Sequence, residues 1–235
     1  MQRVRYEAAA LAAILALANA RSAWGDIRVL TFEGLADHEQ VLDYYNGGLG
    51  GWDSGPGVNF GVQFNADALA LIDFDAGGTG NFGGEPSGST ILYFAKGTQA
   101  VMNVPAGFDT GFSFYYSTIA APGWVEVYDG LDGGGALLGS FDLPLTPFFG
   151  EPDPTGAFSP LLPIGVGFGG VARSVVFGGV ENGIGFDNVT FGSPNPVPEP
   201  GTAALAAVGA AALGGMLLRR RTRCRIKSPT PWSPS

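Results

Sequence analysis

Short apolar or alternating runs recur along the middle of the chain, separated by breaks rich in Gly, Pro, Asn and Asp. Phe, Tyr, Val and Ile are frequent in these runs, which is the pattern of strands and turns. No stretch here keeps a helical period for long, and only residues 37–45 predict a turn or two of helix. The expected strands are residues 28–32, 58–64, 69–74, 90–94, 100–104, 112–117, 124–128, 137–143, 164–168, 174–177 and 185–191.

This number of short strands in a region of about 170 residues predicts an all-β fold. Because strands with one buried face pair as layers, we expect a two-sheet β-sandwich of jelly-roll type. The region spans residues 26–193 and forms one domain of ordinary size.

The N-terminus has the features of an export signal. Arg3 and Arg5 precede an apolar run over residues 8–18, and Ala18-Asn19-Ala20 offers a cleavage site with small residues. A second possible cleavage site follows Gly25. We therefore expect a signal peptide within residues 1–25, and a chain exported through the inner membrane.

The C-terminal part combines three features in a fixed order. Pro198-Glu199-Pro200 comes first, followed by the uncharged residues 202–218 and a basic cluster over residues 219–227. As a helix, the 17 uncharged residues would rise about 25 Å, which is within the range of membrane-spanning helices. The basic cluster should remain cytoplasmic, because positive charge is retained on that side.

This order of features resembles the C-terminal sorting tail of bacterial PEP-CTERM proteins, here over residues 194–227. The resemblance implies that an exosortase-type membrane enzyme reads the tail, and that the precursor spans the inner membrane once. The protein would then reach the cell surface or the extracellular polysaccharide matrix. A permanent single-pass anchor is the alternative. Residues 228–235 would form a disordered C-terminal extension.

Charge is distributed unevenly along the chain. Of 21 acidic residues, 19 lie between Asp26 and Pro198, together with only 3 of the 12 basic residues, so this region has a net charge of −16. Such a surface repels nucleic acid and anionic lipid but is compatible with calcium. Cys224 is the only cysteine, so disulfides and a thiolate zinc site are excluded for the sandwich.

The first and last predicted strands suggest a metal site. The apolar phase changes at Asp187-Asn188, which predicts a bulge or a change of buried face in the last strand. Glu33 ends the first strand. The chain resembles jelly-roll carbohydrate-binding modules in architecture, and this resemblance implies a structural calcium between the first and last strands, held by Glu33 and Asp187. The alternative is that Asp187 caps a turn while Glu33 is solvated.

The segment 124–128 provides a candidate carbohydrate-binding surface. If Val125 and Val127 face the core, Trp124, Glu126 and Tyr128 face outward by the period of two. An indole ring beside a carboxylate is suited to stack on a sugar ring and to bond its hydroxyl groups. Cross-strand aromatic packing is the alternative.

A proline-rich segment bears on this prediction. Residues 143–163 contain six prolines together with Phe148, Phe149 and Phe158. Because these phenylalanines do not suit a solvated linker, we expect one long ordered loop. The loop is also the obvious candidate to cover Trp124.

Catalytic motifs are scarce. His38 is the only histidine, and beside Asp37 and Glu39 it is expected to be a surface residue. Paired carboxylates about 5–10 Å apart can hydrolyse glycosidic bonds, but the sequence does not select a pair. We therefore expect a non-enzymatic surface or matrix protein with a structural or carbohydrate-binding role, bound to exopolysaccharide, and keep a secreted glycan hydrolase as the alternative.

Overall fold

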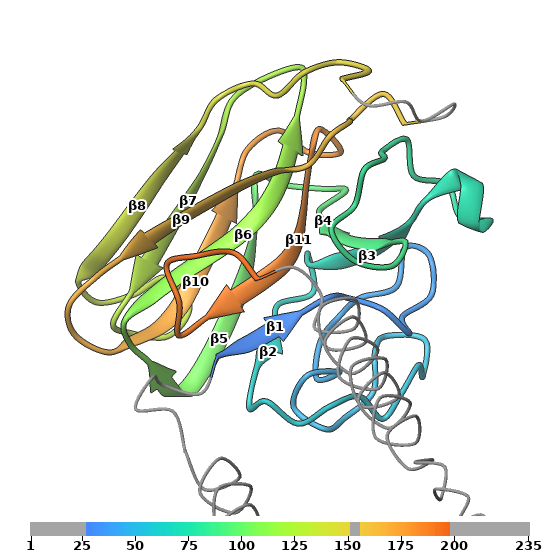
Figure 1. Ribbon diagram of the computed structural model, residues 1–235. Helices are drawn as coiled ribbons and strands as arrows, with labels where there is room; N and C mark the ends of the chain where they lie inside the picture. The colour runs from blue at the N-terminus through green and yellow to red at the C-terminus, as the bar shows by residue number, and fades with distance from the viewer. Residues whose placement is uncertain (1–26, 151–155, 198–235) are drawn as a thin grey trace, which may run out of the picture. The chain divides into compact units, whose positions relative to one another are not determined.

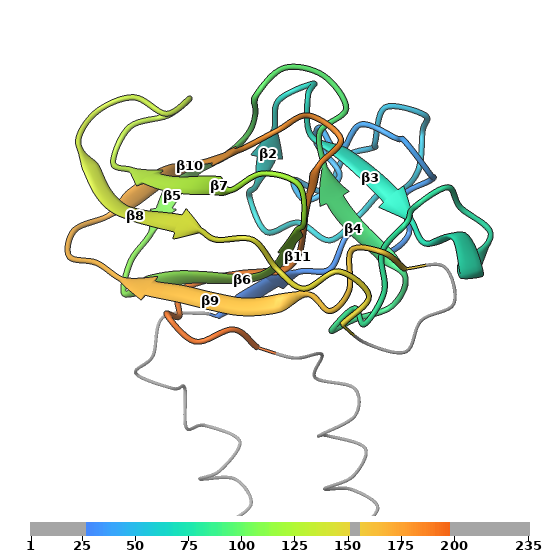
Figure 2. The same cartoon turned by 90° about the horizontal axis from the view of Figure 1, so that it is seen from above.

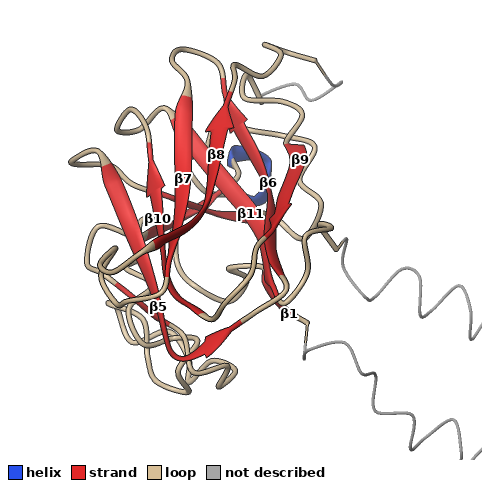
Figure 3. Cartoon of the chain, turned by 90° about the vertical axis from the view of Figure 1, so that its left-hand side faces the viewer, coloured by secondary structure: helices blue, strands red, loops and turns tan. Residues whose placement is uncertain are grey.

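The computed structural model describes residues 27–150 and 156–197. The predicted signal peptide, sorting motif, spanning helix, basic cluster and C-terminal extension lie outside these residues. The strands are β1 (Arg28–Leu30), β2 (Gln63–Phe64), β3 (Leu69–Ile72), β4 (Thr90–Tyr93), β5 (Gln99–Phe108), β6 (Gly111–Thr118), β7 (Gly123–Tyr128), β8 (Leu137–Leu143), β9 (Leu162–Gly167), β10 (Ala172–Gly178) and β11 (Ile184–Phe191). One 3-10 turn, η1 (Phe74–Ala76), follows β3 (Figure 3).

The strands form two antiparallel sheets packed face to face, so the predicted two-sheet sandwich is confirmed (Figures 1 and 2). One sheet has the order β3-β4-β11-β6-β9, with β1 also paired to β11, and the other has the order β2-β5-β10-β7-β8. From β4 onward the orders 4-11-6-9 and 5-10-7-8 interlock as two Greek keys, which is the jelly-roll arrangement.

The strand boundaries agree closely with the apolar runs, with two informative differences. β5 extends to Phe108, beyond the expected 100–104, because β10 pairs with it as far as that residue. β2 begins only at Gln63, since Asn59 accepts a hydrogen bond from the Gly61 amide and Gly61 adopts a positive φ of 70°. That local turn competes with strand pairing.

The helix expected at residues 37–45 is wrong. His38 and Leu42 adopt left-handed φ values of 62° and 45°, which interrupt any helical run. The segment instead follows the edge of the six-stranded sheet, where the Val41 amide donates to the Ala68 carbonyl and the Ala70 amide donates to the Glu39 carbonyl. Pairing with β3 thus replaces helical hydrogen bonds.

Phenylalanines from both sheets fill the space between the layers. The Phe186 ring of β11 lies 5.0 Å from Phe177 of β10 and 5.6 Å from Phe114 of β6, measured between ring centroids. These rings meet edge to face, the geometry that aromatic quadrupoles favour. All three side chains are fully buried, so this cluster is the centre of the hydrophobic core.

Loops cover the outer face of the six-stranded sheet, where Phe82, Ile91 and Leu161 form a second buried cluster. Phe158 packs on this cluster and bridges to Phe82. The described part of the proline-rich loop therefore lies over the six-stranded sheet, and the expectation that it covers Trp124 is wrong, because β7 belongs to the other sheet. Phe148 is 62% exposed and Phe149 is 54% exposed, so of the three phenylalanines only Phe158 is sheltered.

Residues 27–150 and 156–197 contain no helix that is long and apolar enough to cross a membrane. The predicted spanning segment, residues 202–218, stays a prediction.

Candidate functional site

Side chains of β7 alternate as the sequence predicts. Val125 and Val127 are fully buried, whereas Trp124, Glu126 and Tyr128 are half-buried on the opposite face of the strand. This face is the outer surface of the five-stranded sheet, between β10 and β8. The structure therefore brings the three predicted carbohydrate-binding residues together in one row.

A glycine determines how the indole ring of Trp124 lies. Gly178 of β10 is the cross-strand partner of Trp124, and a Cβ atom at Gly178 would overlap Cδ2, Cε2 and Cζ2 of the indole. Two of these atoms, Cδ2 and Cε2, join the two rings, so the indole covers Gly178 with a face rather than an edge. Trp124 is half-buried, so part of the indole stays accessible on the outer surface of the sheet.

The other two residues of the row bond each other. The Tyr128 hydroxyl donates to Glu126 Oε2 at 2.5 Å, and this hydrogen bond, together with burial, raises the pKa of Tyr128. Beyond Tyr128, the β7–β8 loop folds over the sheet. Asn103 Nδ2 donates to Asp132 Oδ1 at 2.6 Å, and the Gly133 amide donates to Ser174 Oγ at 3.0 Å. The uncovered strip is therefore centred on β7.

The second candidate site lies where the first and last strands pair. β1 pairs with β11, with Leu30 opposite Val189. The register of β11 against β6 shifts between Asp187 and Thr190, and Asn188 has a positive φ of 46°, so the predicted bulge is confirmed. Phe186 and Val189 are three residues apart and would face opposite sides of a regular strand. The bulge lets both side chains face the same core.

Buried oxygen atoms gather at this bulge, in a group that we call the oxygen cluster: Ser87 Oγ, the Asp187 carboxylate and Asn188 Oδ1. Ser87 Oγ lies 2.5 Å from Asn188 Oδ1 and 3.1 and 3.4 Å from the two Asp187 oxygens. One hydroxyl proton cannot satisfy three acceptors. Asp187 is fully buried, and its burial raises its pKa well above the ordinary value.

Glu33 lies beside the oxygen cluster and is only partly exposed to solvent. It is half-buried, and Oε1 accepts hydrogen bonds from the Ser89 and Thr90 amides at 2.8 Å each. Its negative charge acts on Asp187 and contributes to that residue's raised pKa. Asp187 also accepts a hydrogen bond from the Asn188 amide at 2.6 Å, as the turn-capping alternative requires.

The donor set of the oxygen cluster fits a hard cation. Carboxylate, amide and hydroxyl oxygens are the ligands that calcium takes in proteins. The part of the chain that the structure describes contains no group of three or more His, Cys, Asp or Glu side chains suited to a metal. Ligands besides Glu33 and Asp187 would therefore come from Asn188, Ser87 and backbone carbonyls.

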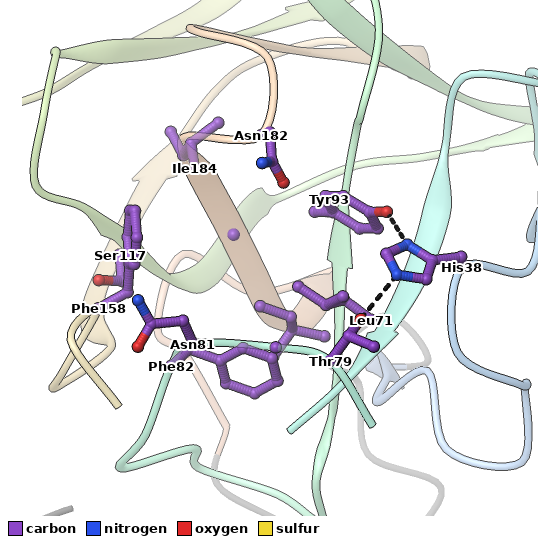
Figure 4. A pocket seen from close by; sticks show the side chains of 13 residues that line it. His38, Leu71, Thr79, Asn81, Phe82, Tyr93, Ser117, Phe158, Asn182 and Ile184 are labelled. Carbon is purple, nitrogen blue, oxygen red and sulfur yellow. Dashed lines mark hydrogen bonds between the residues drawn. The ribbon is translucent and has the colours of Figure 1, made fainter. Parts of the chain in front are cut away.

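A pocket of about 400 Å³ opens on the outer face of the six-stranded sheet (Figure 4). It lies over Gly185 of β11, which pairs with Ser117 of β6 and with Tyr93 of β4. Loops supply the rest of the wall. The lining residues are His38, Leu71, Thr79, Gly80, Asn81, Phe82, Ile91, Tyr93, Ser117, Phe158, Asn182, Ile184 and Gly185.

A chain of hydrogen bonds orders one end of the pocket. His38 Nδ1 bonds the Tyr93 hydroxyl, His38 Nε2 lies 2.6 Å from Thr79 Oγ1, and Thr79 Oγ1 donates to Asp37 Oδ2 at 2.8 Å. Burial, reinforced by the charge of Asp37, raises the pKa of Tyr93 to about 12, so the phenol remains a donor. Each of these hydrogen-bonding groups has a partner when the Tyr93 hydroxyl donates to His38 Nδ1 and His38 Nε2–H donates to Thr79 Oγ1.

The sequence does not reveal this pocket. His38 is exposed, as expected, but it is held by residues 41 and 55 positions away. Thr79 and Asn81 belong to a glycine-rich stretch that reads as a turn. No local spacing connects these residues, because pairing between distant segments brings them together.

No protein-family model matches the chain, and no curated protein sequence matches it. Among solved structures, the K2 cleaved adhesin domain of Lys-gingipain is 14% identical, with 71% of this chain and 99% of that domain covered at a TM-score of 0.45. An arabinoxylan arabinofuranohydrolase of glycoside hydrolase family 43 from Bacillus subtilis, in complex with cellotetraose, is 18% identical (54% and 24% covered, TM-score 0.35). A carbohydrate-binding module from Cellvibrio mixtus lichenase 5A, in complex with cellotriose, is 11% identical (54% and 86% covered, TM-score 0.30). At such identities and TM-scores, the ligand has to be argued from this chain's own residues.

Proposed function

We propose that this protein is an exported surface or matrix protein that binds polysaccharide through Trp124, Glu126 and Tyr128. The observation that carries the proposal is the indole ring of Trp124, which lies over Gly178 and stays partly accessible on the outer surface of the five-stranded sheet. An exposed indole face stacks on the apolar face of a sugar ring. The neighbouring Glu126 and Tyr128 supply oxygen atoms for sugar hydroxyls.

The preferred polysaccharide is neutral. Residues 26–198 have a net charge of −16, which repels acidic polymers. The hydrolase alternative would need a second carboxylate about 5–10 Å from Glu126, because glycosidic hydrolysis uses a pair.

Retention on polysaccharide tests this proposal. The full chain, in a detergent without a sugar headgroup, is passed over immobilised neutral polysaccharides, and the Trp124→Ala variant is compared with it. By analogy with bases stacking on aromatic rings, the loss is about 1–3 kcal/mol, or roughly 5- to 150-fold in affinity. Half-burial of Trp124 predicts a loss of folding stability of only about 1–2 kcal/mol.

Trp52→Ala is the matched control, because Trp52 is 63% exposed and lies outside the row on β7. We expect this variant to be retained like the unaltered protein. Equal retention of the Trp124→Ala variant would contradict the proposed site. Equal losses in both tryptophan variants would indicate nonspecific adhesion to aromatic side chains.

The sorting tail gives the proposal its location. Pro198-Glu199-Pro200 before an apolar segment and a basic cluster supports recognition by an exosortase-type enzyme of the inner membrane. Mass spectrometry of the extracellular protein should then find a C-terminus near this motif, without Arg219 to Arg221. Glu199→Ala should leave precursor in the inner membrane. Extracellular peptides that include Met216 would favour a permanent anchor instead.

Calcium is proposed as a structural ion at the oxygen cluster. Its support is the fully buried Asp187 carboxylate, which faces Asn188 Oδ1, Ser87 Oγ and the negative charge of Glu33. A divalent cation would relieve this concentration of oxygen atoms and would tie the first strand to the last.

A further inference from the structure

The pocket over Gly185 has the chemistry of a ligand site that is separate from the row on β7. It lies on the outer face of the six-stranded sheet, whereas Trp124 lies on the five-stranded sheet. Its volume of about 400 Å³ falls near the lower end of the range of small-molecule sites, which is roughly 300–1,000 Å³. A single small ring therefore suits it better than a long chain.

Apolar side chains form the floor and part of the walls. Ile184 flanks Gly185 on β11, Leu71 and Ile91 come from β3 and β4, and Phe82 and Phe158 come from the covering loops. Ile91 and Phe82 belong to the second buried cluster, so this surface is held rigidly. Leu71 and Phe158 are only partly buried, so they give a ligand its accessible apolar contact.

Two carboxamides at the rim provide the polar contacts. Asn81 Oδ1 accepts a hydrogen bond from the Ala157 amide at 3.0 Å, which fixes the group and leaves its Nδ2 donors to spare. The Asn182 side chain has no hydrogen-bond partner among the residues that the structure describes, and it projects into the space above β11 (Figure 4). A carboxamide both donates and accepts, so it matches neighbouring hydroxyl groups.

Charge narrows the choice of ligand. His38 is the only ionisable group besides the Tyr93 phenol in the described lining, and Asp37 lies close behind it, with Oδ2 3.6 Å from Nε2. An anionic ligand would meet this carboxylate and an acidic surface, whereas a cationic ligand would find no carboxylate in the lining itself. A neutral ligand with one apolar face and several hydroxyl groups fits best.

We propose that the pocket over Gly185 binds one neutral sugar ring, with its apolar face on Leu71 and Phe158 and its hydroxyl groups on Asn81 and Asn182. The inference shares its ligand class with the proposed function but none of its residues, so the two can fail separately. The ring is either a free monosaccharide or the terminal unit of a glycan, and both present the same chemistry to the pocket.

Ligand-observed NMR of the full chain tests the proposal, with methyl glycosides of the common neutral hexoses and pentoses as probes and a detergent without a sugar headgroup. Saturation transfer from the protein to at least one methyl glycoside is expected at millimolar concentration. Asn182→Ala should weaken this binding about 2- to 10-fold, because one hydrogen bond is lost. Asn81→Ala should act in the same direction.

Glu181→Ala is the matched control, because Glu181 is exposed, precedes Asn182 in the same loop and lies outside the lining. It should leave binding of the methyl glycoside unchanged. If oligosaccharides that end in the preferred sugar bind more tightly than the methyl glycoside, the natural ligand is the terminal unit of a glycan rather than a free monosaccharide.

Two results would overturn the pocket proposal: no methyl glycoside binds, or binding is the same in the Asn81, Asn182 and unaltered proteins. The experiments give a different result if the proposed polysaccharide site on β7 is wrong. In that case Trp124→Ala retains its affinity for polysaccharide, while the Asn182 variant still loses affinity for the methyl glycoside.

Discussion

The outer faces of the two sheets differ although both follow the same strand periodicity. The six-stranded sheet is covered by the loops that carry Phe82 and Phe158, and it buries the oxygen cluster and the pocket over Gly185. The five-stranded sheet leaves the row on β7 half-exposed. The ligand proposed for the pocket therefore lies on the covered face, and the proposed polysaccharide site lies on the open face.

One strand glycine shapes each of these faces. Gly178 accepts the indole ring of Trp124 where a Cβ atom would overlap it. Gly185 makes room for the Ile91 side chain at the floor of the pocket, since a Cβ atom there would lie 2.5 Å from Ile91 Cδ1. A glycine in a strand costs backbone entropy, so its presence at these positions is explained by close approach of another group.

The covered side also shows how two buried carboxylates differ. Glu39 is fully buried and accepts hydrogen bonds from the amides of Ala36, Trp52 and Ser54 at 2.7–3.1 Å. Burial raises the pKa of Glu39, but the hydrogen bonds outweigh it, so the pKa is lowered overall. Asp187 has fewer donors, and its pKa is raised.

The largest predicted effect follows from Glu39→Ala. Removing a charged acceptor of three backbone amides should lower the free energy of unfolding by about 3 kcal/mol. This corresponds to a fall in Tm of about 6–12 °C, which thermal unfolding measures. Glu39→Gln keeps one acceptor oxygen and should cost less. Equal stability of the alanine variant would show that water replaces the carboxylate without cost.

The same residue predicts an acid transition. Because the folded-state pKa of Glu39 is below its unfolded value of about 4.3, its stabilisation is complete above that pH and is lost as the pH falls through the folded-state pKa. The Glu39→Gln variant should show a flatter decline in Tm over this acid range. An identical decline in both proteins would assign the acid transition to other carboxylates.

Calcium should give the next largest effect. At a hundredfold excess over Kd, binding to the folded state alone adds about 2.7 kcal/mol, or about 5–10 °C in Tm. Asp187→Asn should lose this gain in calcium. In chelator the same variant should be as stable as the unaltered protein or more so, because a buried and poorly paired carboxylate has been removed.

Ser140→Ala is the control for the calcium experiment, since Ser140 lies on β8, opposite Glu126 and in the other sheet. It should respond to calcium like the unaltered protein. An unchanged Tm on addition of calcium and chelator would leave Asp187 as a turn cap with a raised pKa and no ion.

Gly178→Ala sharpens the account of the open face. The added methyl group should displace the indole of Trp124 and cost about 1–3 kcal/mol of stability through overpacking. Retention on polysaccharide should fall toward that of Trp124→Ala, although the tryptophan is still present. The double variant separates the two effects: if Gly178→Ala acts through the indole, it adds little to the loss of retention in Trp124→Ala.

The smallest predicted effect is that of Tyr128→Phe. It removes the hydroxyl that bonds Glu126 Oε2 but keeps the ring. Retention should fall by about 0.5–1 kcal/mol, or roughly 2- to 5-fold. Stability should change by less than about 0.5 kcal/mol, because the pair lies at the surface. A loss as large as that of Trp124→Ala would place the main polymer contact on Tyr128.

Much of the fold follows from local patterns. Alternation over β7 buries Val125 and Val127, and the phase change near Asp187 marks the bulge of β11. Residues 37–45 are an exception: their local pattern predicts a helix, but their backbone groups bond the edge of β3 instead. The signal peptide and the sorting tail rest on sequence patterns and stay predictions.

Local sequence patterns predict the all-β class, the strands and the outward side of Trp124, because these depend on side chains a few residues apart. The folded chain is needed to know which sheet the proline-rich loop covers, which glycine lies under the indole, and which residues meet at the pocket. His38, Tyr93 and Thr79 come from distant segments, as do Ser87 and Asp187, which are 100 positions apart. Their proximity depends on pairing between distant segments: residues 38–41 pair along β3, β3 pairs with β4, and β4 pairs with β11. No local period encodes those pairings.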